Sequence, residues 1–362
     1  MDAGAKALSP GTPVDVVGDD GHVFGTGYFN PNSLIAVRLL APERGTPLNA
    51  DFFAVRLKRA LRLRESMTAS PYYRLANAEG DHLPGLTIDR FGNTAVVQIA
   101  TAGMEALVDP ILAALDATIA PETVVLKADV PARSLEGLES YVRAAKGEAG
   151  RITVEENGVR YFADLSAGQK TGWYYDQRDN RAFVASLSRG RSVLDACCYS
   201  GGFALAAVKA GAREAAGIDS SAPALALAGE AAAANNLSCA FLKADVFEKL
   251  AELAAGGDRF DVVVADPPPF VKSRKALEAG AKAYRKLAKL AAGVTAKEGV
   301  LMLATCSHNM PADRFALECA EGIARAGRTA RLIRASGAGF DHPVHPMLPE
   351  SAYLKALTYT LD

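Results

Sequence analysis

Two short runs, each at the end of an apolar segment, hold residues suited to covalent chemistry. D-P-P-P-F at residues 266–270 follows the strand-like run 262–265, and T-C-S at residues 305–307 follows the strand-like run 300–304. Successive prolines fix φ and donate no hydrogen bond, so Asp266 and Phe270 are held in set directions. A carboxylate there can accept a hydrogen bond from the amino group of a base, and an aromatic ring can stack on that base.

Cys306 leaves its apolar run into the polar sequence T-C-S-H-N. A thiolate at that place, within reach of Asp266, would serve as the nucleophile for an electron-poor pyrimidine carbon. A structural cysteine at a strand end is the alternative. We interpret the other cysteines as small core residues without chemistry, namely Cys197, Cys198, Cys239 and Cys319.

A run with paired glycines lies upstream, S-V-L-D-A-C-C-Y-S-G-G at residues 192–202. It predicts a strand ending at Asp195, a tight turn at Gly201 and Gly202, and a helix N-terminus, where backbone N–H groups converge on a ligand. The next strand-like run ends in Asp219. An acid at the tip of the second strand can accept hydrogen bonds from ribose hydroxyls, so we expect a cofactor that contains a nucleoside. An ordinary turn with a solvated Asp219 is the alternative.

Alternating strand-like and helical segments continue from about residue 164 to the C-terminal end, and they indicate an α/β fold with a largely parallel sheet covered by helices on both faces. The strands are expected near Val193, Ala215, Ala240, Val262, Val300, Leu332 and Tyr353. Ligands of such sheets bind beyond the carboxyl ends of the strands. We therefore expect the residues at those ends to share one rim, namely Asp195, Asp219, Asp245, Asp266 and Cys306.

Composition narrows the class of protein. The chain has 362 residues, of which 49% are hydrophobic and 22% are charged, as in an ordinary globular protein. Its formal net charge is −1, so the overall charge does not indicate a nucleic-acid partner. Any RNA would need a local cluster of basic residues. Five cysteines without paired spacing or a CxxC motif predict a reducing cytoplasm and no metal site. No segment has the pattern of a signal peptide or a membrane span.

Two regions precede the alternating part. Residues 14–40 show three short apolar runs separated by turn residues, which indicates a small β-rich module, and Asn49 is a candidate N-cap for the basic helix that follows. Strand and helix patterns then lead to a hairpin signal at Asn157-Gly158. We expect domains at residues 1–66, at 67–165 with an α+β fold, and at 166–362.

Several longer runs together resemble one known family. They are S-A-G-Q-K-T-G-W-Y-Y-D-Q-R-D-N-R at 166–181, L-D-A-C-C-Y-S-G-G-F at 194–203, D-P-P-P-F, T-C-S, and D-H-P-V-H-P at 341–346. These runs look like the signatures of the RlmI-like bacterial large-subunit rRNA cytosine-5 methyltransferases, which use S-adenosylmethionine (SAM). The resemblance implies a PUA-like RNA-binding module that lacks its usual first strands, a central α+β domain, and a Rossmann-like methyltransferase domain. Its mostly parallel, seven-stranded sheet would have an antiparallel last strand.

The resemblance also implies roles for individual residues. Cys306 and Asp266 would be catalytic. The cofactor-binding set would be Gln169, Lys170, Thr171, Gly172, Arg178, Asp195, Tyr199, Gly201, Gly202, Phe203, Asp219, Ser220, Asp245, Val246 and Asp266. The substrate contacts would be Phe270, Lys272, Arg274 and Lys275. The expected partner is the 23S rRNA in the cytoplasm, with neither a membrane nor a metal, and a homodimer is left open. Pro269 stands where the family commonly has lysine.

In the mechanism that the family implies, the thiolate of Cys306 adds to C6 of a flipped-out cytosine and C5 attacks the methyl group of SAM, while Asp266 holds the N3/N4 edge of the base. The base that removes the C5 proton is not identified. Residues 272–289 carry many lysines and arginines against one acid, Glu278. This basic segment is a candidate for phosphate contacts, with a solvated helix face as the alternative.

Three other functions fit parts of the sequence. D-P-P-P-F also resembles the loop of enzymes that methylate base nitrogens and need no thiol. An NAD-dependent dehydrogenase would share the fold, although the G-x-G-x-x-G pattern is absent. A non-catalytic RNA-binding or ribosome-assembly protein is the third.

Overall fold

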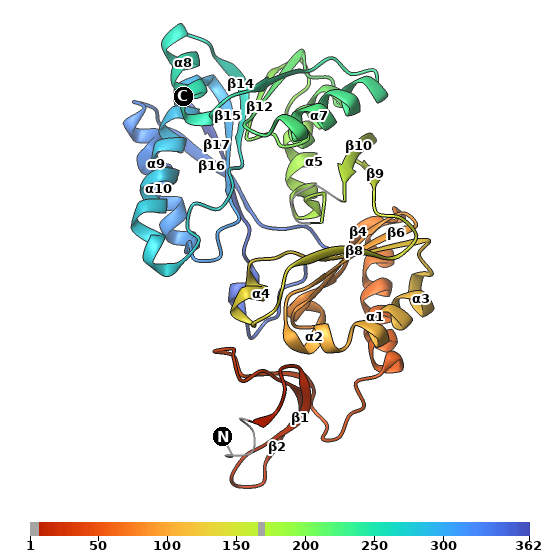
Figure 1. Ribbon diagram of the computed structural model, residues 1–362. Helices are drawn as coiled ribbons and strands as arrows, with labels where there is room; N and C mark the ends of the chain where they lie inside the picture. Colours follow the sequence, from red (N-terminus) through yellow and green to blue (C-terminus); the bar gives the residue numbers. More distant parts are fainter. Residues whose placement is uncertain (1–6, 166–170) are drawn as a thin grey trace. The chain divides into compact units, whose positions relative to one another are not determined.

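The computed structural model describes residues 7–165 and 171–362 of the chain. The chain forms two compact units, and each is assembled from separate segments (Figure 1). The first unit contains residues 1–152, 164–175 and 340–349, and the second contains residues 153–163, 176–339 and 350–362.

The first unit holds two sheets. An antiparallel sheet of order β1-β2-β3 comprises β1 (Thr12–Val17), β2 (Val23–Phe29) and β3 (Val37–Ala41). A five-stranded sheet of order β4-β5-β6-β7-β8 comprises β4 (Tyr72–Asn77), β5 (Leu86–Phe91), β6 (Thr94–Ile99), β7 (Thr123–Ala128) and β8 (Tyr141–Lys146). The helices are α1 (Ala50–Met67), α2 (Ala102–Ala106), α3 (Val108–Ile119) and α4 (Ala132–Leu135).

Strand β8 has no counterpart in the sequence-based expectations, which left its stretch without an assigned element. It lies at the edge of its sheet and most of its residues are exposed. An edge strand pairs on one side only and has little apolar surface to bury, so it carries no alternating pattern.

The run D-H-P-V-H-P belongs to the first unit although it lies near the end of the chain. The buried guanidinium of Arg64 pairs with Asp81 at 2.6 Å and also donates to the backbone carbonyl of Asp341 at 2.8 Å. The Asp341 carboxylate in turn accepts from the backbone N–H of Arg74 at 2.9 Å. These bonds give the run a structural role in this unit.

The second unit is built on a seven-stranded sheet of order β13-β12-β11-β14-β15-β17-β16. Its strands are β11 (Ser192–Ala196), β12 (Glu214–Asp219), β13 (Ala240–Lys243), β14 (Phe260–Ala265), β15 (Thr295–Thr305), β16 (Ala330–Ser336) and β17 (Lys355–Leu361). Strands β11 to β15 pair in parallel, whereas β17 runs antiparallel to both of its neighbours. The expected Rossmann-like sheet with an antiparallel last strand is confirmed.

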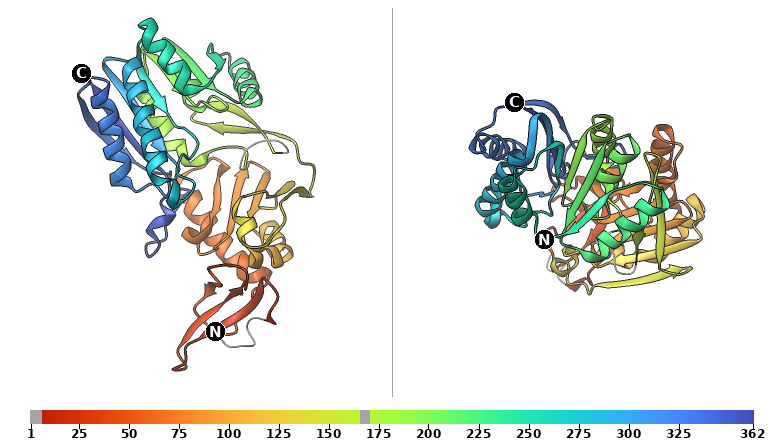
Figure 2. Two further views of the ribbon diagram at one scale, coloured as in Figure 1. Left: turned by 60° about the vertical axis from the view of Figure 1, so that its left-hand side comes forward. Right: turned by 90° about the horizontal axis from the view of Figure 1, so that it is seen from above.

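Helices cover both faces of this sheet. They are α5 (Arg178–Ser186), α6 (Gly202–Lys209), α7 (Ala222–Ala234), α8 (Val246–Gly256), α9 (Leu277–Val294) and α10 (Ala312–Arg325). Helices α9 and α10 lie side by side (Figures 1 and 2). The hairpin of β9 (Arg151–Glu156) and β10 (Val159–Asp164) turns at Asn157 and Gly158, both at positive φ, as the sequence predicts.

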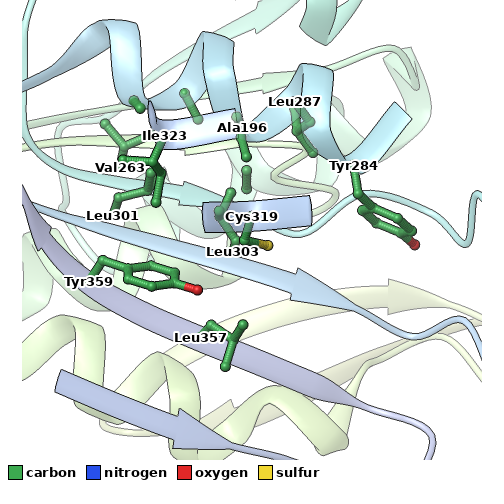
Figure 3. Packing of buried hydrophobic residues seen from close by; sticks show 14 of the residues in the cluster. Ala196, Val263, Tyr284, Leu287, Leu301, Leu303, Cys319, Ile323, Leu357 and Tyr359 are labelled. Atoms are coloured by element: carbon green, nitrogen blue, oxygen red, sulfur yellow. The ribbon is translucent and has the colours of Figure 1, made fainter. Parts of the chain in front are cut away.

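Alternation along each strand divides the core of the second unit between the two faces. Leu301 and Leu303 of β15 pack with residues of α9 and α10 on one face, as Figure 3 shows. Val300 and Met302 pack on the other face with residues of α5 and α6. Because both faces are buried, these strands are continuously apolar and polar side chains occur where the strands end.

Candidate active site

The turn after β11 folds back onto β12. The backbone N–H groups of Cys197 and Cys198 both donate to the carbonyl of Ile218, each at 2.9 Å. The backbone then passes through positive φ at Cys197, at Tyr199 and at Gly201, where φ is 80°. A Cβ on Gly201 would lie 3.0 Å from the ring of Phe241. Glycine is therefore needed at this position both for its φ and for the close approach.

Asp195 is fully buried and lies one residue before the end of β11. Its Oδ2 accepts from the backbone N–H of Ala204 in the first turns of α6 at 3.0 Å, whereas its Oδ1 is buried and has no hydrogen-bond partner among the described residues. Burial, together with the negative charges of Asp266 and Asp219, raises the pKa of Asp195 to about 7. The site thus contains a buried carboxyl oxygen that can still accept a hydrogen bond or contact a cation.

Four carboxylates gather around the turn after β11. Burial raises the pKa of the Cys197 thiol, and the charges of Asp266, Asp219, Asp195 and Asp245 raise it further. These four acids were expected at one rim together with Cys306, and their negative charge favours a cationic ligand.

Two of these acids also hold backbone. Asp219 accepts from the N–H groups of Tyr199 and Ser221, each at 2.8 Å. Asp245 is exposed and caps α8 by accepting from Phe247 N at 2.8 Å and Glu248 N at 3.1 Å. Each carboxylate oxygen has a second lone pair, so Asp219 keeps acceptor capacity for a ribose.

Asp266 is oriented by residues that sequence reasoning missed. The side-chain amide of Gln177 donates to Asp266 Oδ2 at 2.8 Å, and Asn180 donates to Gln177 Oε1 at 2.7 Å. Ser336 at the end of β16 donates to Asn180 Oδ1 at 2.8 Å. Gln177 and Asn180 are both buried. They lie in the run D-Q-R-D-N-R, where their three-residue spacing at the start of α5 was the available signal.

The turn that carries Cys306 is joined to the end of the D-P-P-P-F loop by the phenol of Tyr284. Thr305 donates to the phenol oxygen at 2.6 Å, and the phenol lies 2.8 Å from Ser307 Oγ. Two backbone N–H groups complete the network, since Phe270 donates to the phenol at 3.3 Å and Val271 N donates to Ser307 Oγ at 3.2 Å. The structure therefore brings the two predicted catalytic segments together.

Phe270 lies half-buried in this network, with its ring 4.7 Å from that of Tyr284 and 5.9 Å from that of Phe247. These contacts fix the ring at the end of the loop. Just beyond it, Lys272, Arg274 and Lys275 are exposed.

Cys306 is half-buried and directly follows Thr305, the last residue of β15. Cys198 and Cys319 are buried, Cys197 and Cys239 are half-buried, and burial raises the pKa of all four thiols, that of Cys239 to about 12. Burial thus favours the neutral form of these four thiols, and their interpretation as structural residues stays a prediction.

The remaining predicted cofactor residues lie in varied surroundings. Arg178 Nε is 3.5 Å from Glu156 Oε2, and Arg181 holds the same carboxylate at 2.5 and 2.9 Å. Gly202 and Phe203 are buried, Val246 is half-buried, and Ser220 is exposed. Thr171 and Gly172 belong to the first unit. Gln169 and Lys170 lie outside the described residues.

Within residues 7–165 and 171–362, no cluster of three or more His, Cys, Asp or Glu side chains could hold a metal ion. Over the same residues, no helix has both the length and the apolar character that crossing a membrane requires.

Comparison with known families assigns the class. Residues 141–359 match the S-adenosylmethionine-dependent methyltransferase family, and residues 2–42 match the PUA-like domain family. The sheet order and the rim of acids at the carboxyl ends of its strands agree with this match. The fold and the site are thus those of a Rossmann-like, SAM-dependent methyltransferase, which confirms the cofactor prediction.

Similarity over nearly the whole chain narrows the class further. A "Ribosomal RNA large subunit methyltransferase I" of Shewanella frigidimarina is 38% identical over 96% of this chain and 89% of that protein. One of Photobacterium profundum is 37% identical with the same coverage. SMU.776, solved in complex with SAH, shares the fold with a TM-score of 0.84 at 22% identity, over 97% of this chain and 92% of that one. The chain belongs to the ribosomal RNA large subunit methyltransferase I family.

Proposed function

We propose that this protein methylates C5 of a cytosine in large-subunit rRNA through a covalent bond between Cys306 and C6 of the base. The relatives named for large-subunit rRNA support the substrate. The network of Tyr284, which joins the turn of Cys306 to the loop that begins at Asp266, carries the chemical part of the proposal. The network bonds the residues on either side of Cys306 to the end of the loop that begins at Asp266, and this supports the proposal because covalent catalysis on a ring requires a nucleophile and a carboxylate at set positions.

The acidic rim fits SAM. The cofactor carries a sulfonium and an ammonium group, and the site offers an unpartnered, buried Asp195 Oδ1 together with the buried hydroxyl of Ser200, which also lacks a partner among the described residues. We propose that Asp195 holds the ammonium end and Asp219 holds the ribose hydroxyls. When bound, SAM supplies an electrophilic methyl group.

The residues of the chain then act in a fixed order. The Cys306 thiolate forms a bond to C6, and the electrons of the C5–C6 double bond make C5 nucleophilic. Asp266 takes the hydrogen bond from the base amino group, in an orientation that Gln177 fixes. C5 would take the methyl group as the bond from that methyl to the cofactor's sulfur breaks, which leaves S-adenosylhomocysteine. Loss of the C5 proton to a base then restores the C5–C6 double bond and expels the thiolate. Cys306 leaves the cycle unchanged.

The test uses rRNA fragments, labelled SAM and nucleoside analysis of the product. The wild-type protein should yield 5-methylcytosine. Cys306→Ala should lose this product by a factor of about 10³ or more, because covalent activation of C6 is lost. Cys239→Ala, which removes another half-buried thiol of the same unit, should keep it.

A mechanism-based trap adds a second readout. RNA with 5-fluorocytidine has no C5 proton to lose, so the adduct with Cys306 should persist and be found by mass spectrometry. Methylation of a base nitrogen that survives Cys306→Ala would overturn the proposal and favour the rival that needs no thiol. Binding of rRNA without any methyl transfer would favour a non-catalytic role.

A further inference from the structure

Lys355 lies beside the turn that carries Cys306, on the neighbouring strand β17. It is the first residue of β17, and the antiparallel register pairs it with Thr305 of β15. Its Nζ donates to the backbone carbonyl of Ser307 at 3.2 Å. The side chain is thus fixed beside residue 305 at its base and beside residue 307 at its tip. Cys306 is the residue between these two anchors.

The charge of Lys355 has an unusual environment. The residue is half-buried, and burial lowers its pKa, while the negative charge of a Cys306 thiolate acts in the opposite direction. Over the described residues, no carboxylate lies within ion-pair distance of its ammonium, and the Ser307 carbonyl uses one of its three donors. A half-buried cation without an anionic partner is costly, and a thiolate at Cys306 would supply that partner.

The other titratable groups around this turn are differently engaged. Burial raises the pKa of the Tyr284 phenol on α9, and this phenol is hydrogen-bonded to Thr305 and Ser307, the residues on either side of Cys306. His308, two residues on, stacks on Tyr353 with ring centroids 5.0 Å apart. Asp266 has its Oδ2 bound to Gln177. Among the described residues, Lys355 is therefore a cation placed beside this turn.

We propose that Lys355 is a positioning residue for Cys306, whose ammonium group holds the cysteine as a thiolate at neutral pH and directs its sulfur. The thiol proton passes to solvent, and Lys355 stays protonated throughout. The inference rests on the proposed function, because a thiolate is the species that adds to C6. The same pairing would stabilise the thiolate again when it is expelled from the methylated base.

Alkylation of the thiol by iodoacetamide tests the pairing without any methyl transfer. The rate at Cys306 is followed by peptide mass spectrometry from about pH 5.5 to about pH 9.5 in the full chain without RNA, because the thiolate reacts and the thiol does not. Lys355→Met should move the midpoint of the profile up by about one pH unit, and lower the rate at neutral pH about tenfold. Lys355→Arg, which keeps the charge, should stay near the wild-type profile.

Controls separate charge from structure. Lys297→Met makes the same change at an exposed lysine of β15, the strand that leads to Cys306, near the other end of that strand, and should leave the profile unchanged. Lys355→Gln removes the charge but keeps a donor for the Ser307 carbonyl, and it should behave like Lys355→Met. Binding of S-adenosylhomocysteine reports whether each variant is folded.

The outcomes distinguish the two proposals. An unchanged alkylation profile in folded Lys355→Gln overturns the pairing, even if the wild-type protein makes 5-methylcytosine. A shifted profile in a protein whose product is methylated on nitrogen upholds the pairing and overturns the proposed function.

Discussion

Replacing Asp195 with asparagine tests the electrostatics of the acidic rim most directly. Burial and the neighbouring acids raise the pKa of this carboxyl to about 7. Asparagine has nearly the shape of the protonated acid, and its oxygen can still accept from Ala204 N, which donates to Asp195 at 3.0 Å. The substitution therefore removes the ionisation and keeps most of the packing.

The sign of the effect on stability follows from the raised pKa. An unfolded aspartate titrates near pH 3.9, so between about pH 4 and pH 7 the folded protein binds a proton that the unfolded chain has released. The free energy of unfolding that comes from this carboxyl is fully present below about pH 4 and is lost as the pH rises through about 7. The pKa difference of about three units, at about 1.4 kcal/mol each, corresponds to a loss of about 4 kcal/mol in the free energy of unfolding. Asp195→Asn should not show this loss.

The effect on cofactor binding has the opposite sign. If the ionised carboxylate binds the ammonium group, the wild-type affinity for S-adenosylhomocysteine should fall about tenfold from about pH 8 to about pH 6, as protonation competes. Asp195→Asn should bind more weakly at about pH 8 and show little of this dependence.

Two measurements between about pH 4 and about pH 8 check the effects on stability and on cofactor binding. Urea denaturation gives the difference in stability between the variant and the wild type, and titration calorimetry gives the affinity for S-adenosylhomocysteine. The difference in stability should grow in favour of the variant as the pH rises. Parallel stability curves for the two proteins would refute the raised pKa, and a wild-type affinity independent of pH would refute the assigned contact.

Three further variants, one of them with three substitutions, address the neighbouring parts of the site. Tyr284→Phe removes the hydroxyl that joins the two proposed catalytic segments, so it should lower the free energy of unfolding by about 1–3 kcal/mol, as thermal unfolding would show. It should also lower the methylation rate and leave the affinity for SAM unchanged. An unaltered rate would show that the network is dispensable. Gln177→Leu frees one oxygen of the loop carboxylate and should lower kcat more than it raises KM, as steady-state kinetics would show. Neutralising Lys272, Arg274 and Lys275 together should reduce the slope of log Kd for rRNA against log salt by about two to three, whereas an unchanged slope would mean that these residues face solvent only.

The sequence by itself determined the sheet and the rim. Strands buried on both faces must be apolar throughout, so the runs around Val262 and Val300 stand out and polar residues such as Asp195 and Asp266 mark their ends. Parallel strands place those ends at one edge, which is why an acidic rim follows from the pattern alone. The Asn157-Gly158 turn was equally readable, because its positive φ values demand those residue types.

Other features depended on the tertiary structure. Sequence did not show that Asp245 caps a helix, since an aspartate after a strand suits a cap and a ligand site equally. Nor did it show that the run around Asp341 packs within the first unit.

The contacts of the two proposed catalytic segments were also decided by the fold. Gln177 is hydrogen-bonded to Asp266, Tyr284 to the side chain of Ser307, and Lys355 to the backbone carbonyl of Ser307. The two partners of each bond lie far apart in the sequence. A local pattern records which residues are buried together on one face of a strand or helix. Such a pattern does not indicate which polar atoms of different elements form hydrogen bonds, because strand order and register set the distances between those atoms.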